Sequence, residues 1–341
     1  MADAVALVGA GMVSAVGLSA PEVAASIRAG TMRMAESALL DGHRQPFVLA
    51  EVPEAGLAPL HPGIAGCAPE SRDARLLRLA GPALCECLRH LPAGAPPPPL
   101  VVALPEYLHP LEGGGVLDGL SLQAGGFDRA RGEAFHRGRS GGIRAIARAA
   151  CLLDEGTPFV VAGGVDSHRD AAALEALEAD GRLRSAWNLD GFVPGEGAAF
   201  VLIGPRGAAG ALATLSGFAA GTEPGHLHGT EPYRGEGLAA VVAAALGAAG
   251  EPVGEVYSSM NGESHWVREW GVAYLRRRAR FAEDHGFHHP ADCQGDTGAA
   301  AGPLMAALAA LGIAGGYRRA PCLVYGSSDR GERAALLVHP P

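Results

Sequence analysis

The sequence predicts an α/β protein made of two halves of similar order, and three observations support this prediction. Short apolar runs, typical of buried strands, alternate along the chain with longer segments of helical periodicity. The same order recurs after Pro205-Arg206-Gly207. The length of 341 residues suits two fused lobes better than one ordinary domain. We therefore divide the chain into an N-terminal half, residues 1–205, and a C-terminal half, residues 206–341, and expect mostly parallel sheet packed between helices.

The first half opens on an apolar run at residues 5–9, which predicts a buried strand that enters a turn at Gly9-Ala10-Gly11. Glycines at 113–126 predict a surface loop. Helical patterns predict helices over residues 21–29, 72–91 and 140–153. Further apolar runs predict core strands over residues 100–104, 159–162 and 198–203.

The second half repeats this alternation. Apolar runs predict strands over residues 211–217, 253–258, 322–325 and 334–338. Helices are predicted over residues 238–246, 267–281 and 299–311. His285, His288 and His289 lie close together before Pro290, but zinc would need further ligands at a defined spacing. We therefore expect a solvated loop there and no metal site.

Composition limits the classes of function. The net charge is −9, whereas nucleic-acid binding needs a basic surface. All 27 basic side chains apart from histidine are arginine, which excludes chemistry that depends on lysine. No apolar run approaches the ~18 residues of a membrane span, and the first residues lack the basic region of a signal peptide. The six cysteines show no metal or disulfide spacing, so we expect reduced thiols in a cytoplasmic protein without a cofactor.

Four segments carry a family resemblance, and they occur in the expected order. They are VGAGMVSAVGL at 8–18, AGGV at 162–165, GFVPGEGAA at 191–199 and GDTGAAAG at 295–302. Together they resemble the β-ketoacyl synthases, the carbon–carbon condensing enzymes of the thiolase fold. The resemblance implies a thiolase-like fold, with two duplicated α/β halves in a five-layered α-β-α-β-α arrangement and the active site between the halves. The chain is short for this family, which implies trimmed loops.

The resemblance also assigns positions to the family's Cys-His-His triad, and none of the three residues is present there. The nucleophile position falls at Arg139, or at Ser140 with a shift of one residue. The histidine positions fall at Asn261 and Asp296. Arginine cannot attack a thioester, and an ionised Asp296 would repel the enolate that forms during decarboxylation. The late loop of the family resembles residues 325–329, with its gating aromatic replaced by Ser327. We therefore expect no condensing activity.

Each position also has a structural interpretation. Arg139 and Asp296 would form a buried ion pair that fills the former pocket. Ser140 is either a helix cap or a nucleophile assisted by Asp296 or His136. Cys293 is either a small core residue or a displaced nucleophile. We favour the structural interpretation in each case.

The remaining candidates surround the former histidine site. Asn261-Gly262-Glu263 and Glu269-Trp270 form a polar and aromatic cluster, which predicts either a ligand or peptide pocket or a hydrogen-bonded support for loops. Glu106 ends a strand and either lines the cleft or turns the chain. The stretch Arg276 to Arg278 is either a solvated helix face, which we favour, or a partner contact, because arginine is favoured at interfaces. A binding role predicts that Trp270 and this stretch are exposed and contact the partner.

We therefore expect a catalytically inactive, ketosynthase-like binding or adaptor protein that forms a homodimer or heterodimer. It resembles the short ketosynthase-like proteins that accompany effectors of bacterial type VI secretion, which carry similar Asn-Gly-Glu, Glu-Trp and Gly-Asp segments. The alternative is an accessory subunit like the chain-length factors of type II fatty acid or polyketide synthases, paired with a ketosynthase and its acyl carrier protein. If the protein is an enzyme, we expect a divergent acyltransferase or hydrolase that uses Ser140 or Cys293.

Overall fold

One ten-stranded sheet runs through the computed structural model, which describes residues 4–64, 68, 71–106, 113–247 and 250–341. The strand order is β10-β9-β11-β12-β8-β1-β7-β6-β4-β5. From the centre outward, each half follows the same order, because β8-β12-β11-β9-β10 mirrors β1-β7-β6-β4-β5. The strands of the first half are β1 (Val5–Ser14), β4 (Pro99–Leu104), β5 (Asp128–His136), β6 (Val160–Ser167) and β7 (Glu196–Gly204). Those of the second half are β8 (Ala213–Thr222), β9 (Val253–Ser258), β10 (Phe281–His288), β11 (Cys322–Ser327) and β12 (Glu332–His339).

The sheet is mixed, so the prediction of a mostly parallel sheet was wrong. In each half the three outer strands are parallel, namely β6-β4-β5 and β11-β9-β10. The two inner strands of each half pair antiparallel, and β1 pairs antiparallel with β8 across the centre. Strand β7 returns antiparallel beside β6 through the long connection at residues 168–195, whereas β12 returns antiparallel beside β11 through a short hairpin turn at residues 328–331. The alternation of helices and strands predicts parallel crossovers and carries no information about either return.

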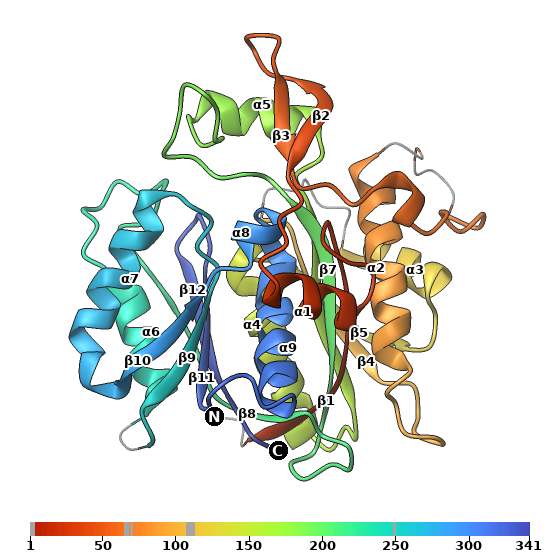
Figure 1. Ribbon diagram of the computed structural model, residues 1–341. Coiled ribbons are helices and arrows are strands. Elements are labelled where there is room, and N and C mark those ends of the chain that lie inside the picture. The colour runs from red at the N-terminus through yellow and green to blue at the C-terminus, as the bar shows by residue number, and fades with distance from the viewer. Residues whose placement is uncertain (1–3, 65–67, 69–70, 107–112, 248–249) are drawn as a thin grey trace.

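Helices complete five layers (Figure 1). On one outer face lie α2 (Arg72–Leu88) and α3 (Gly113–Gln123), and on the other lie α6 (Glu236–Leu246) and α7 (Ser264–Arg277). Between the two halves of the sheet lie α4 (Gly138–Asp154) and α9 (Ala301–Ala314), which pack against strands of both halves and against each other. Figure 1 also shows α1 (Ala20–Arg28) and the single-turn α8 (Ala291–Gln294) beside this central layer. The predicted α-β-α-β-α arrangement is confirmed.

Strand β1 continues through the expected turn at Gly9-Ala10-Gly11. The glycines are there because α2 packs directly on this strand. A Cβ on Gly9 would lie 2.2 Å from the His90 side chain, and a Cβ on Gly11 would lie 2.0 Å from the Ala83 carbonyl oxygen. Close helix packing, rather than a turn, explains this sequence pattern.

Two other expected loops are regular elements. Residues 113–123 form α3, although the glycines there predict a loop. His285 and His288 lie on β10, and Nε2 of His288 is 2.7 Å from Oε2 of Glu255. Among the described residues, no group of three or more His, Cys, Asp or Glu side chains has an arrangement that would hold a metal ion.

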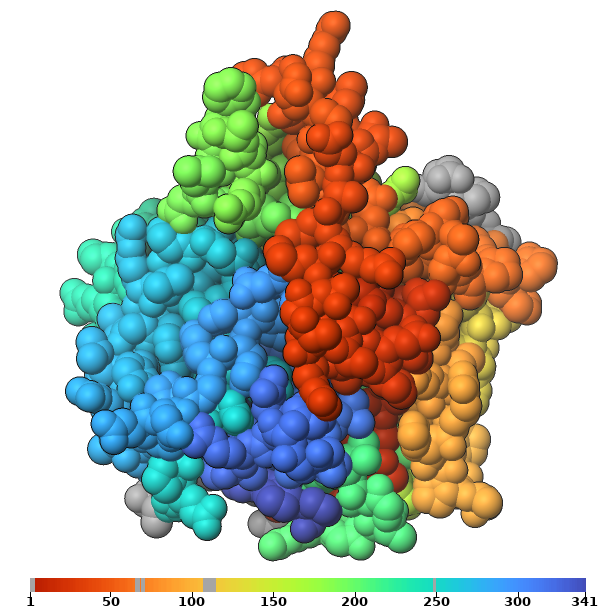
Figure 2. All heavy atoms as spheres, in the orientation of Figure 1, coloured from red at the N-terminus to blue at the C-terminus, as the bar shows by residue number. Residues whose placement is uncertain are grey.

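A small head projects from the body above the central layer (Figures 1 and 2). It consists of the hairpin β2 (Ala35–Leu40) and β3 (Pro46–Leu49), together with α5 (Ala171–Ala179). Its own apolar core contains Phe47, Leu49, Leu174, Leu183 and Phe192. The proposed boundary between the halves, at residues 205 and 206, falls in the connection between β7 and β8. In the described part of the chain, no helix is both long and apolar enough to cross a bilayer.

Candidate functional site

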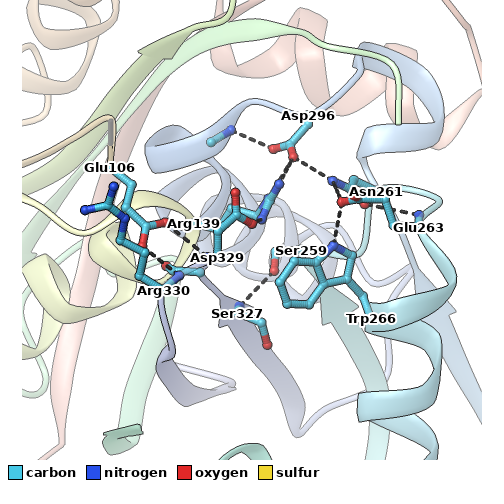
Figure 3. Close-up of polar contacts among 12 residues, drawn as sticks. Glu106, Arg139, Ser259, Asn261, Glu263, Trp266, Asp296, Ser327, Asp329 and Arg330 are labelled. Atoms are coloured by element: carbon cyan, nitrogen blue, oxygen red, sulfur yellow. Dashed lines mark hydrogen bonds and ion pairs between the residues drawn. The ribbon is translucent and has the colours of Figure 1, made fainter. Parts of the chain in front are cut away.

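The first turn of α4 carries Arg139 into the interior between the two halves (Figure 3). Gly138 precedes it with φ of +56°, a backbone conformation that favours glycine. Arg139 is only 5% exposed. Its Nε donates to Oδ2 of Asp296 over 2.7 Å, and its Nη1 donates to Oδ1 of Asp329 over 2.6 Å. A guanidinium therefore occupies the helix start to which the resemblance assigns the nucleophile.

Asp296 and Asn261, at the positions that the resemblance assigns to the two histidines, lie beside Arg139. Asp296 follows α8 after Gly295, which has φ of +66°. Its Oδ2 accepts a hydrogen bond of 2.8 Å from Nδ2 of Asn261, and its Oδ1 accepts one of 2.9 Å from the backbone N–H of Gly298. Arg139, Asn261 and Asp296 therefore meet in one buried network, with the ion pair between Arg139 and Asp296 at its centre (Figure 3).

Sequence reasoning missed a second arginine in this network. Arg182 lies in the loop after α5, and its Nε and Nη2 each donate to the Glu263 carboxylate over 2.8 Å. Its Nη1 donates to Oδ2 of Asp329 over 2.6 Å. Asp329 thus bridges Arg139 and Arg182. No local motif marks a loop arginine such as Arg182, because its partners lie 81 and 147 residues away.

The network has more carboxylates than guanidiniums. Arg139 and Arg182 face Asp296, Asp329 and Glu263. Burial alone would raise the pKa of Asp296, but the Arg139 charge and the hydrogen bonds from Arg139 and Asn261 outweigh burial and lower it. In the same way, Arg139 and Arg182 overcome burial and hold the pKa of Asp329 well below its usual value. Asp296 and Asp329 are therefore ionised in the folded protein near neutral pH.

The lowered pKa values predict acid sensitivity. A carboxyl group whose pKa is lower in the folded state than in the unfolded state stabilises the fold at any pH above its unfolded pKa, which is about 3.9. This contribution is lost as the pH falls through the folded pKa. Glu106 and Glu269, whose pKa values burial raises, act with the opposite sign. We expect the free energy of unfolding, measured by urea titration, to fall steeply below about pH 4.

The matched variant is Asp329→Asn. It removes one of the carboxyl groups with a lowered pKa, so the acid-dependent loss should be smaller than in the wild type, although the variant is less stable near neutral pH. Equal losses for both proteins below about pH 4 would contradict the assignment of this loss to the network.

Glu269 and Trp270 lie in a neighbouring buried cluster. Glu269 accepts hydrogen bonds of 2.6 Å from both Arg333 Nε and Ser327 Oγ. Trp270 stacks on Tyr325 with ring centroids 4.8 Å apart, and it is 8% exposed. The expectation that Trp270 is an exposed partner contact was therefore wrong, because one face of α7 packs on the sheet. Residues 276–278 at the end of α7 are exposed, as expected.

The two alternative nucleophiles have unsuitable surroundings. The Ser140 hydroxyl is hydrogen-bonded to Ser328 Oγ over 2.9 Å and to the Arg137 carbonyl over 3.4 Å, and neither group is a base. The Cys293 side chain is buried near Asp292, and burial raises the pKa of its thiol above the usual value. Both conditions disfavour nucleophilic attack.

Glu106 lies at the edge of a cavity of about 540 Å³ between α5 and the start of α4. Its carboxylate accepts hydrogen bonds from the backbone N–H groups of Asp329 and Arg330, over 3.1 and 2.9 Å (Figure 3). Arg139 and Arg182 also line this cavity, so the buried network forms its floor. Glu106 therefore lines the cleft, as one of its two interpretations requires.

No protein-family model matches the chain. A segment of 82 residues is 35% identical to an actinorhodin polyketide putative beta-ketoacyl synthase 2 from Streptomyces coelicolor. That match spans 21% of this chain and 20% of the relative, so the chain matches only a fifth of the length of that protein.

Solved structures match over the whole chain. A ketosynthase ApeO in complex with its chain length factor ApeC, from Xenorhabdus doucetiae, superposes with a TM-score of 0.79 at 16% identity, covering 99% of this chain and 98% of that chain. A type II polyketide synthase ketosynthase in complex with its acyl-carrier protein gives 0.79 at 16% identity, with 100% of both chains covered. The ishigamide ketosynthase/chain length factor gives 0.74 at 18% identity, with 99% of both chains covered. The protein therefore has the thiolase-like fold of the ketosynthases.

Proposed function

We propose that this chain is a ketosynthase-like protein without condensing activity that pairs with a catalytically competent ketosynthase, as chain-length factors do. The observation that carries the proposal is the Arg139 guanidinium at the start of α4, held by the carboxylates of Asp296 and Asp329. Condensation needs a thiolate at this place, and a guanidinium paired with two carboxylates is neither nucleophilic nor easily displaced. The likeness to structures described as ketosynthase and chain-length-factor complexes supports the choice of partner.

A second candidate is an adaptor for an effector of type VI secretion. The observation that favours it is the meeting of Asn261, Glu263 and Asp296, from the Asn-Gly-Glu and Gly-Asp segments, in one network. Those side chains are buried, so they would stabilise the scaffold and leave partner binding to exposed residues such as Arg277, the last residue of α7, and Arg278, which follows it.

Affinity purification of the tagged chain from its native host, followed by native mass spectrometry, separates the two candidates. The first predicts a stoichiometric heterodimer with a ketosynthase that carries the Cys-His-His triad, accompanied by an acyl carrier protein. The adaptor hypothesis predicts a secreted effector or a secretion component instead. A chain that elutes alone or as a homodimer, and elongates acyl chains without a partner, would overturn the proposal.

Substitution of the two alternative nucleophiles tests whether the role is binding. We expect Ser140→Ala and Cys293→Ala, alone or together, to retain the partner and the activity of the complex, because neither side chain has a base positioned to activate it. Product formation by the purified heterodimer is the measurement. Loss of product with an intact heterodimer would instead support acyl transfer by this chain.

A charge reversal at the exposed end of α7 tests whether this surface contacts the partner. Arg277→Glu with Arg278→Glu reverses two exposed charges at the end of α7, and we expect weaker heterodimer formation. Arg206→Glu, an exposed arginine in the connection after β7, is the matched control. If both variants bind the partner equally, the partner contacts another surface.

A further inference from the structure

Exposed apolar side chains form a row along the outer side of α7. This helix lies on the outside of the molecule (Figure 1), and its inner side packs on the sheet. The outer side carries Val267, Gly271 and Leu275, whose spacing of four residues places them one above the other. Val267 is 54% exposed and Leu275 is 72% exposed. We call these three residues the α7 row, and it presents an apolar surface to solvent.

The loop after α5 extends this surface. The Asp190 carboxylate accepts hydrogen bonds of 2.7 Å from the backbone N–H and from Oγ of Ser264, the first residue of α7. This contact fixes the end of the loop at the start of the helix. Just before Asp190, the loop carries Leu189, which is 75% exposed, and Trp187, which is 77% exposed. The apolar surface therefore runs from the loop along α7.

Hydrogen bonds hold this loop in one shape. Oγ of Ser185 accepts from the backbone N–H groups of Trp187 and Asn188, each over 3.1 Å. Nδ2 of Asn188 donates to two backbone carbonyl oxygens of the same loop. A loop that is already ordered loses little conformational entropy on binding, and tryptophan is enriched among the residues that dominate binding energy. Contact with a partner explains why Trp187 and Leu189 are held in solvent.

The charges beside the α7 row are positive. Glu269 is the only acidic residue of α7, and it is buried against the sheet. Exposed arginines lie on either end of the row, with Arg268 beside its first residue and Arg277 and Arg278 after its last. Among the described residues, no carboxylate forms an ion pair with any of the three, and Asp190 is engaged by Ser264. Their charge is therefore available to an anionic partner.

The shape of the α7 row fits a helix. Side chains four residues apart form a ridge beside which a second helix packs, and a glycine in the row lets the two backbones approach closely. A Cβ on Gly271 would meet no other heavy atom within 4 Å, so the space above it is open. A second copy of α7 is a poor match, because its arginines would repel those of the first. An anionic membrane is disfavoured by the net charge of −9.

We propose that the α7 row, together with Trp187 and Leu189, binds an amphipathic helix of a partner protein. The apolar side of that helix faces the row, and its flanking side chains are acidic and pair with Arg268 and Arg278. The proposal rests on the binding role proposed above and deepens it, because it names the kind of element that α7 contacts. It holds for a ketosynthase partner and for any other protein that offers such a helix.

Two designed peptides test this chemistry. Both have about 20 residues, which is long enough to form a helix, and leucines spaced to give one apolar side. One peptide carries glutamate at the flanking positions, and the other carries lysine at the same positions. In isothermal titration calorimetry with the full chain at low salt, we expect the acidic peptide to bind at least about tenfold more tightly, and its affinity to fall as salt is added. Equal binding of the two peptides, or no binding of the acidic peptide at millimolar concentration, would overturn the proposal.

Variants locate the peptide on α7. Leu275→Asp puts a negative charge in the row and should weaken binding of the acidic peptide by about tenfold or more. Arg268→Glu with Arg278→Glu should reverse the preference, so that the lysine peptide binds more tightly. Leu122→Asp on α3 and Arg206→Glu change an exposed leucine and an exposed arginine elsewhere, and both controls should bind as the wild type does. If the variants on α7 bind as the controls do, the peptide binds another surface and the proposal fails.

Heterodimer formation, measured by native mass spectrometry, keeps this proposal apart from the pairing with a ketosynthase. A heterodimer that forms while the acidic peptide does not bind overturns the helix proposal alone, whereas peptide binding without a ketosynthase in the purified complex overturns the pairing alone. Vesicles of phosphatidylcholine with phosphatidylserine, and sedimentation of the chain by itself, test the other occupants. Vesicle binding or self-association that Leu275→Asp abolishes would identify a membrane or a second copy as the occupant and refute the helix proposal.

Discussion

Arg139→Ala is expected to lower the free energy of unfolding by about 3–5 kcal/mol. The Arg139 side chain is 6% exposed and pairs with Asp296 and Asp329, which are 2% and 6% exposed. Its removal leaves two carboxylates in the interior without their shared guanidinium, although Asn261, Arg182 and the backbone N–H of Gly298 still donate to them. An unpaired buried charge costs far more than a paired one gains. Urea unfolding near neutral pH is the measurement.

Two further variants show that the cost comes from the unpaired charge. Arg277→Ala removes an exposed arginine and should change stability by no more than about 0.5 kcal/mol. Arg139→Met with Asp296→Asn removes one charge of each sign and should recover part of the loss. If Arg139→Ala is as mild as Arg277→Ala, the network contributes nothing to stability.

Gly142→Ala is expected to destabilise the protein by about 3 kcal/mol, although alanine favours helices. Gly142 lies in α4 where this helix crosses α9, the central helix of the other half. A Cβ there would lie 2.1 Å from Cδ of Pro303 and 2.9 Å from the carbonyl oxygen of Ala299. A proline ring cannot turn aside, so the two central helices would have to separate.

The same substitution at Gly271 should have the opposite sign. Gly271 lies inside α7, and a Cβ there has no other heavy atom within 4 Å. Gly271→Ala should therefore stabilise the protein by about 0.5–1 kcal/mol through helix propensity and the unfolded chain. Thermal unfolding of both variants is a direct comparison. Equal shifts would show that α4 and α9 are not in tight contact.

The architecture was largely predictable from local patterns. Residues 72–91 and 140–153 have helical periodicity, and the helices observed are 72–88 and 138–154. Repetition of similar order predicts two related halves, and both halves show the same strand order. Strand direction was less predictable. β7 returns antiparallel beside β6 through a long connection that local periodicity does not describe, and β12 returns beside β11 through a hairpin turn at residues 328–331 that the predicted alternation did not include.

The candidate site was predictable in part. Arg139, Asn261 and Asp296 were identified because each stands at a position that the motif resemblance assigns, and the structure brings all three together. Arg182 was missed because nothing in its neighbouring residues distinguishes it from a solvated loop arginine. Trp270 was misplaced because the exposed side of a helix cannot be chosen until its neighbours are known.

By itself, the sequence determined the alternation of helices and strands in two similar halves and, through the four motif segments, the resemblance that implies a thiolase-like architecture, because these depend on residue identity and local periodicity. Only the tertiary structure decided which charges pair. Asp329 meets Arg139 and Arg182 across 190 and 147 residues of chain, and Glu106 reaches the start of α4 from the end of β4. Ion pairs form between side chains that are close in space, and distance along the chain does not determine that closeness.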